Sequence, residues 1–128
     1  MQKEISEGNQ ERRSRVLIVD NSAVMRKIIN EALAELPRVE VVGQAKDGVE
    51  ALECIRQLQP DIVIMDIQMP RMSGLEALRQ IPPGRCRVIM LSAAADQWYM
   101  EKCRQLNAEQ VFNKLTGFQE FVECVAAM

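Results

Sequence analysis

The sequence contains no histidine, and aromatic residues make up only 4% of its 128 residues. Its four cysteines, at positions 54, 86, 103 and 124, are widely spaced and form no Cys-x-x-Cys pair. Protein zinc sites usually need closely spaced cysteines, often together with histidine, so a zinc site is not indicated. A chain of this length can bury a core without disulfides, and we therefore expect free thiols in a reducing cytoplasm.

Two further absences narrow the class of protein. No apolar run approaches the roughly 18 residues that suggest a membrane helix, and the N-terminus is polar. The net charge is −2, so the sequence does not suggest the clustered basic side chains that bind phosphate backbones. We expect neither a membrane segment, nor a signal peptide, nor direct binding to nucleic acid.

Short apolar runs rich in β-branched residues recur along the chain, and segments with helical spacing of apolar residues alternate with them. The runs lie at 16–19, 39–42, 62–65, 88–91 and, more weakly, 111–112, and helices are expected from about Met25, Val49, Leu75, Tyr99 and Phe118. Strict alternation predicts an α/β domain with a doubly wound parallel sheet. Residues 1–14 lack this pattern and are expected to form a flexible tail, with one domain over 15–128.

Polar residues follow four of the five predicted strands. Asp20 and Asn21 follow the first, Asp66 the third, Ser92 the fourth and Lys114 the fifth. Each alone could be a turn residue, a helix cap or a surface side chain. Together they would meet at the carboxyl ends of the strands, where open α/β sheets bind ligands. Such a group could hold Mg²⁺ through oxygen atoms and form an acyl phosphate on a carboxylate.

The sequence resembles the receiver domains of two-component response regulators from about Arg15 to its C-terminus. The most specific segment is 66–74, which reads Asp-x-x-Met-Pro-x-Met-x-Gly, and it is supported by 16–22, 91–93 and 112–114. The resemblance implies a flavodoxin-like (βα)5 fold with strand order 2-1-3-4-5. It implies a phosphoacceptor signalling domain that takes its phosphoryl group from a sensor histidine kinase or phosphotransfer protein and relays it to a partner by conformational change.

The resemblance also assigns roles to individual residues. It makes Asp66 the phosphoacceptor, with Ser92 and Lys114 contacting the phosphoryl group. The magnesium ligands it implies are Asp20, Asn21, Asp66 and the backbone carbonyl of Gln68.

Three positions depart from the family pattern and support a rival interpretation. Asn21 replaces a usual acidic residue, Leu115 replaces a frequent proline, and Val111 stands where an aromatic residue is common. The rival is a pseudo-receiver that binds partners without phosphorylation. A flavin-binding protein is disfavoured because Asp20-Asn21 is a poor start for a phosphate site. An aspartate-dependent phosphatase is disfavoured because Gln68 interrupts the expected Asp-x-Asp pair.

Further expectations concern output. Trp98 and Tyr99 are adjacent on a predicted helix and cannot both face the core, so at least one should be partly exposed, and exposed Trp and Tyr residues are frequent binding hot spots. The resemblance implies that receivers meet their partners through the surface of the last two helices and the strand between them. We therefore predict that this surface carries the output, with Trp98 or Tyr99 as its anchor. The same surface is a candidate for homodimerisation. Because the chain ends after the last helix, we expect either a standalone regulator or a receiver cut from a larger protein, with the standalone form preferred. We expect it to be cytoplasmic and no conventional enzyme. Residues 22–29 resemble receivers of chemotaxis methylesterases.

Overall fold

The computed structural model describes residues 12–94 and 96–128 and contains one five-stranded parallel sheet. The strand order is β2-β1-β3-β4-β5, which confirms the predicted flavodoxin-like arrangement. The strands are β1 (Ser14–Val19), β2 (Val39–Ala45), β3 (Ile62–Met65), β4 (Arg87–Ser92) and β5 (Gln110–Asn113). All neighbouring strands pair in parallel, so their carboxyl ends lie at one edge of the sheet.

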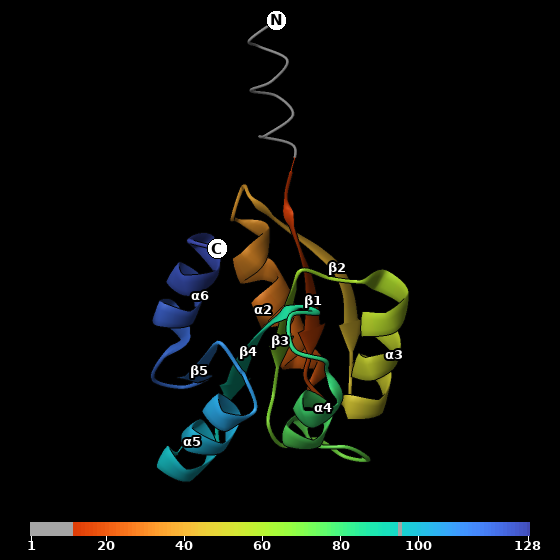
Figure 1. Ribbon diagram of the computed structural model, residues 1–128. Helices are drawn as coiled ribbons and strands as arrows, with labels where there is room; N and C mark the ends of the chain where they lie inside the picture. The colour runs from red at the N-terminus through yellow and green to blue at the C-terminus, as the bar shows by residue number, and fades with distance from the viewer. Residues whose placement is uncertain (1–11, 95) are drawn as a thin grey trace, which may run out of the picture.

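Helices cover both faces of this sheet (Figure 1). They are α2 (Ala23–Ala34), α3 (Gly48–Leu58), α4 (Gly74–Gln80), α5 (Gln97–Gln105) and α6 (Phe118–Ala126). Apolar side chains of α2 and α6 form one core layer with the sheet, and those of α3, α4 and α5 form the other. The sheet is therefore buried on both faces, which explains why its strands read as continuous apolar runs.

Alternation along β5 sends neighbouring side chains to opposite layers. Val111 packs with the layer of α3, α4 and α5, whereas Phe112 packs with the layer of α2 and α6. The ring of Phe112 meets Phe121 of α6 edge-on, with 6.2 Å between the ring centroids. The aromatic side chain of β5 thus lies on the other face from Val111, as the strand period predicts.

Polar side chains cap the N-termini of four helices. Ser22, Asp47, Ser73 and Asp96 each accept a hydrogen bond from a backbone N–H in the first turn of the following helix. Asn107 follows α5 with a φ of 73°, the left-handed conformation expected there. The helical spacing of apolar residues Leu75, Leu78 and Ile81 predicts a helix that includes Ile81, but Ile81 is extended and lies outside α4. Pro82 follows it, and a residue before proline disfavours helical geometry.

The expected tail over 1–14 falls mostly on residues 1–11, which lie outside the described residues. Ser14, which we placed in that tail, is instead the first residue of β1. It pairs with Val39, and its N–H donates to the carbonyl of Arg38 at 2.8 Å. Within 12–94 and 96–128, no helix combines the length and apolar character needed to cross a membrane.

Candidate functional site

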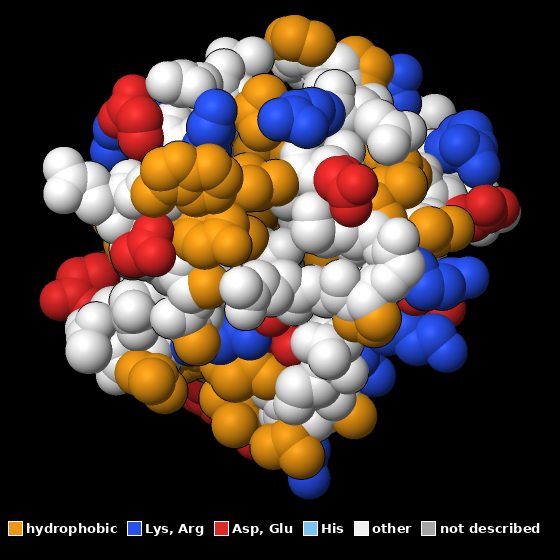
Figure 2. Space-filling view, turned by 90° about the horizontal axis from the view of Figure 1, so that it is seen from below, with side chains coloured by type: hydrophobic (Ala, Val, Ile, Leu, Met, Phe, Trp, Pro, Cys, Tyr) orange, Lys and Arg blue, Asp and Glu red, His pale blue; other side chains and the backbone are white. Residues whose placement is uncertain are grey.

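The carboxylates of Asp20 and Asp66 lie together because their strands are neighbours. Val19 of β1 pairs with Met65 of β3, so the residues that follow them end the strands side by side. The N–H of Asp66 donates to the carbonyl of Val19 at 3.0 Å, which extends the sheet contact by one residue. Figure 2 views the molecule from this end and shows acidic and basic atoms in a recess bordered by hydrophobic side chains.

Lys114 joins these two carboxylates. Its Nζ lies 2.6 Å from Oδ2 of Asp20 and 2.9 Å from Oδ2 of Asp66. The backbone brings it there, because Ser92 pairs with Asn113 and the N–H of Lys114 donates to the Ser92 carbonyl at 3.2 Å. Asp20 and Asp66 are 1% and 6% exposed, so the ammonium group compensates charges that would be costly to bury alone.

Burial and charge act in opposite directions on the pKa of Lys114. Burial lowers this pKa, but the hydrogen bonds and negative charges of Asp20 and Asp66 outweigh that effect and leave it above its ordinary value. Lys114 is therefore a fixed positive charge at neutral pH. A cation held in this position can stabilise negative charge that arrives on a transferred group.

The other oxygens of both carboxylates accept backbone hydrogen bonds. Oδ1 of Asp20 accepts from the N–H of Ser22 at 2.9 Å, and Oδ1 of Asp66 accepts from the N–H of Ile67 at 2.7 Å. These bonds fix the orientation of both carboxylate planes. Each oxygen still has a free lone pair, so it can accept a further ligand.

The remaining predicted site residues lie around this centre without contacting it directly through hydrogen bonds. Ser92 is buried at the end of β4, and its Oγ accepts from the N–H of Ala94 at 3.1 Å. Its hydroxyl hydrogen remains free to donate. Asn21 and Gln68 are exposed, and they lie in the loops that carry Asp20 and Asp66.

The donor atoms at this end of the sheet suit a hard cation. Asn21 directly follows the buried Asp20, and Gln68 lies two residues after the buried Asp66. The side-chain amide of Asn21, the backbone carbonyl of Gln68 and both carboxylates can all offer oxygen atoms. Mg²⁺ prefers such ligands and commonly keeps several waters. Among the described residues, no three side chains of the Asp, Glu, Cys or His types gather as a metal site, since Asn21 takes the place of a third acid. The set fits Mg²⁺ with one charge fewer than three carboxylates would supply.

Gly74 lets the loop after Asp66 close tightly. Its N–H donates to the carbonyl of Ile67 at 2.7 Å, and a Cβ at this position would lie 1.9 Å from the carbonyl oxygen of Asp66. No side chain larger than hydrogen fits this approach. The glycine that ends the Asp-x-x-Met-Pro-x-Met-x-Gly segment therefore has a steric role that its place in the sequence does not reveal.

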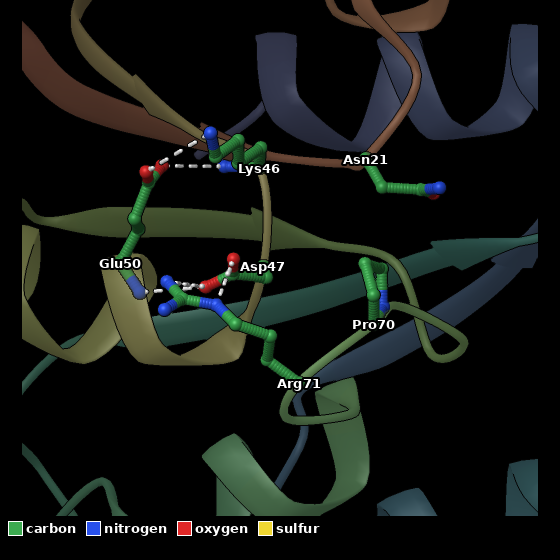
Figure 3. Close-up of a pocket in the computed structure, with 6 residues that line it drawn as sticks. All are labelled: Asn21, Lys46, Asp47, Glu50, Pro70 and Arg71. Atoms are coloured by element: carbon green, nitrogen blue, oxygen red, sulfur yellow. Dashed lines mark hydrogen bonds and ion pairs between the residues drawn. The ribbon is translucent and has the colours of Figure 1, made fainter.

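A cleft of about 630 Å³ is lined by residues of the β1–α2 loop, the β2–α3 turn with the start of α3, and the β3–α4 loop, namely Asn21, Lys46, Asp47, Glu50, Pro70 and Arg71. Figure 3 shows an ion pair across it, in which Nε of Arg71 lies 2.9 Å from Oδ2 of Asp47. A second bond joins Nη2 of Arg71 to Oδ1 of Asp47 at 3.3 Å. The sequence alone did not predict this pair. The spacing of Asp47 and Glu50 at the start of a helix does indicate the capping role of Asp47.

The loop after β5 closes without the proline common in the family. The Lys114–Leu115 peptide is trans, as leucine at this position predicts. Oδ1 of Asn113 accepts hydrogen bonds from the N–H of Leu115 at 2.8 Å and from the N–H of Thr116 at 3.2 Å. The side chain of Asn113 thus shapes the turn that presents Lys114.

Trp98 and Tyr99 differ in exposure, as expected for adjacent residues on a helix. Trp98 is 59% exposed, whereas Tyr99 is half-buried against the core layer of α3, α4 and α5. Their rings meet edge-on with centroids 4.9 Å apart, and Nζ of Lys102 lies 5.6 Å from the Trp98 ring centroid. Trp98 is therefore the exposed member of the pair.

Comparison with known proteins places this geometry in one family. The sequence profile of the response regulator receiver domain matches residues 16–126. The receiver domain of Thermotoga maritima CheB is 32% identical, with a TM-score of 0.81, and the match covers 91% of this chain and 98% of that one. CheY of Borrelia burgdorferi, in a complex with CheX, BeF3 and Mg²⁺, is 28% identical with a TM-score of 0.81, over 89% and 87% of the two chains.

A curated relative corrects one expectation. A protein-glutamate methylesterase/protein-glutamine glutaminase of Pyrococcus abyssi is 46% identical over 87 residues, or 67% of this chain and 24% of that protein. The chain thus spans about a quarter of the length of this relative. The expectation that the protein is no conventional enzyme is wrong in the light of this relative, because its name is that of an enzyme.

The comparisons give no support to the pseudo-receiver alternative. The matched family consists of phosphoacceptor signalling domains, and the match includes the segments that carry Asp20, Asp66, Ser92 and Lys114. The chain belongs to the receiver domain family of two-component response regulators.

Proposed function

We propose that Asp66 accepts the phosphoryl group, from a sensor histidine kinase or a phosphotransfer protein. The observation that carries this proposal is the buried contact of Lys114 with both Asp20 and Asp66. A largely buried carboxylate at the carboxyl end of a strand, held beside a fixed cation, is suited to accept a group that brings negative charge. The receiver domain extends over residues 15–128 in this proposal.

The transfer is a displacement at phosphorus. An oxygen of Asp66 attacks the phosphorus atom, the N–P bond of the donor phosphohistidine breaks, and its electron pair leaves with the imidazole nitrogen. The product is an acyl phosphate on Asp66. Lys114 then faces phosphoryl oxygens in addition to Asp20. The hydroxyl of Ser92 can donate to one of them while its oxygen still accepts from Ala94.

The residues proposed to hold Mg²⁺ are Asp20, Asn21, Asp66 and the backbone carbonyl of Gln68. When bound, the cation neutralises charge on the transferred group. Lys114 already neutralises part of the charge of Asp20 and Asp66, so the ion and the ammonium group share these two carboxylates. We therefore expect weak binding of Mg²⁺ before phosphorylation.

Intact mass measurement tests the acceptor. The protein is incubated with acetyl phosphate and Mg²⁺, and we expect a phosphate-sized increment that Asp66→Asn abolishes. Asp96→Asn is the matched control, because it makes the same chemical change at an exposed helix cap. No increment in the wild type at any Mg²⁺ concentration, or an increment that survives Asp66→Asn, contradicts the proposal.

We further propose that phosphorylation changes the surface formed by α5, β5 and α6, with Trp98 and Tyr99 as partner contacts. The relatives named protein-glutamate methylesterase/protein-glutamine glutaminase suggest an enzyme of this class, in the same or another polypeptide, as the output. The same surface is proposed for self-association, and the cytoplasm is the proposed location. Sedimentation with and without beryllofluoride tests the self-association.

A further inference from the structure

The loop between β3 and α4 must hold its backbone in place if Gln68 is to offer a carbonyl to a cation. Its first residues are held by backbone hydrogen bonds. The N–H of Asp66 donates to the carbonyl of Val19, and the carbonyl of Ile67 accepts from the N–H of Gly74. Its last residues are fixed by the N–H of Gly48, which donates to the carbonyl of Met72 at 3.0 Å. The side chain of Arg71 adds a further contact, because it donates hydrogen bonds to Asp47 at the start of α3.

Arg71 has a backbone conformation that costs energy. Its φ is 64°, in the left-handed region that residues other than glycine rarely adopt. Such a conformation persists when surrounding contacts determine it. The guanidinium group makes two hydrogen bonds to Asp47, at 2.9 and 3.3 Å, and the planar fork of arginine matches a carboxylate in this way.

Asp47 is a buried, hydrogen-bonded partner for that arginine. Its side chain is 3% exposed, whereas that of Arg71 is 57% exposed. Oδ1 of Asp47 also accepts from the N–H of Glu50 at 2.9 Å, which fixes it at the first turn of α3. The Arg71 hydrogen bond and that of Glu50 lower the pKa of Asp47 in spite of its burial. The carboxylate is therefore charged at neutral pH and depends on Arg71 for its counter-ion.

The pair also borders the proposed metal site. Asn21 and Pro70 line the same cleft as Asp47 and Arg71, so one wall carries a proposed ligand and the other the loop that contains Gln68 (Figure 3). Fixing Arg71 to α3 fixes the backbone three residues after Gln68.

We propose that Asp47 and Arg71 are positioning residues that hold the Gln68 carbonyl in place for Mg²⁺. This inference depends on the metal ligands given under the proposed function. Outer partners of metal ligands commonly change metal affinity about 10-fold to 100-fold when they are removed. Loss of either residue should therefore weaken Mg²⁺ binding without touching a ligand.

Three variants test the pair. Asp47→Asn keeps a good helix cap but removes the charge, and Arg71→Gly removes the side chain while relieving the strain at positive φ. The double variant measures their coupling. Asp96→Asn is the control, because it makes the same change at the exposed cap of α5. A variant that fails to fold is replaced by Arg71→Lys, which keeps the charge but lacks the two-pronged contact.

The first measurement is hydrogen exchange of residues 67–72 without metal. We expect faster exchange in both single variants, with little further change in the double variant and no change in Asp96→Asn. Unchanged exchange in Asp47→Asn and Arg71→Gly overturns the inference, whether or not the protein accepts phosphate.

The second measurement is the Mg²⁺ dissociation constant, from titration of the protein with MgCl₂ alone and observation of amide chemical shifts. We expect about a tenfold rise in each single variant. The rate of phosphorylation by acetyl phosphate should return to the wild-type value at saturating Mg²⁺. An unchanged dissociation constant overturns the positioning role, whereas a wild type that binds no Mg²⁺ contradicts the ligand assignment of the proposed function.

Discussion

A Cβ atom on Gly74 would lie 1.9 Å from the carbonyl oxygen of Asp66. The proposed phosphoacceptor and the first residue of α4 are thus packed backbone to backbone. Nothing but a shift of the loop can make room for a larger residue, and that loop carries Asp66, Ile67 and Gln68.

Gly74→Ala is expected to disturb both stability and phosphorylation. Forced overpacking typically costs about 1–3 kcal/mol of unfolding free energy, and we expect the upper part of this range. Urea denaturation measures the stability, and acetyl phosphate labelling should fall at least about tenfold. Gly84→Ala is the control, because it adds the same methyl group at a glycine that open space surrounds. The φ of Gly84 is 83°, so this variant should lose some stability from backbone strain without any contact to the site. Labelling of Gly74→Ala at the wild-type rate would show that the loop adapts without cost.

Asn21→Asp should strengthen Mg²⁺ binding, because it restores a carboxylate beside Asp20 and Asp66. The same change should lower the metal-free unfolding free energy by up to about 1 kcal/mol, because the new, exposed carboxylate would repel the buried carboxylates of Asp20 and Asp66. Titration with MgCl₂ and urea denaturation measure the two effects. Tighter Mg²⁺ binding by the wild type would contradict the assigned ligand set.

Lys114→Met should destabilise the protein without metal, since it leaves two buried carboxylates without their counter-ion. Breaking a buried ion pair on one side costs about 3–5 kcal/mol, and the 13% exposure of the Lys114 side chain favours the lower value. Mg²⁺ should recover part of the loss by replacing the missing charge. Lys46→Met is the control, because Lys46 is an exposed lysine whose contact is with Glu50. Equal stability of the wild type and Lys114→Met without Mg²⁺ would contradict this account.

The Asp47–Arg71 pair should make the free energy of unfolding depend on pH. Hydrogen bonds from Arg71 and Glu50 lower the pKa of Asp47 in the folded protein. Its stabilising contribution is therefore complete well above the ordinary carboxyl pKa of about 3.9 and is lost as the pH falls through the lower, folded-state value. Asp47→Asn should be less stable than the wild type at pH 7, and the difference should shrink with acidification. A difference that is constant from pH 7 to pH 3 would contradict the shift.

Trp98→Ala and Tyr99→Ala should separate partner binding from stability. Trp98 is largely exposed, so its removal should cost less than about 1 kcal/mol, whereas the half-buried Tyr99 should cost about 2 kcal/mol. Trp98 is the only tryptophan, and its fluorescence should change on addition of beryllofluoride and Mg²⁺. Unchanged emission, together with unchanged partner affinity in both variants, would exclude this surface.

The sequence alone determined the order of the elements and the edge of the sheet that carries the site. Continuous apolar runs such as 62–65 predict buried parallel strands, because only helices on both faces can cover them. Parallel pairing then brings Asp20 and Asp66 to one edge without further information. The strand ladder also predicts that Val111 and Phe112 face opposite layers, since side chains alternate along a strand.

The tertiary structure decided which side chains of different elements contact one another, because no local sequence pattern contains that information. The pairing of Asp47 with Arg71 depends on how α3 meets the loop after β3, and these residues lie 24 positions apart. The tight approach of Gly74 to Asp66 depends on the path of that loop, and the two bonds of Lys114 depend on the register of β5 against β4. Periodicity reports which face a side chain takes. Distances between atoms of different elements arise only when the layers pack together.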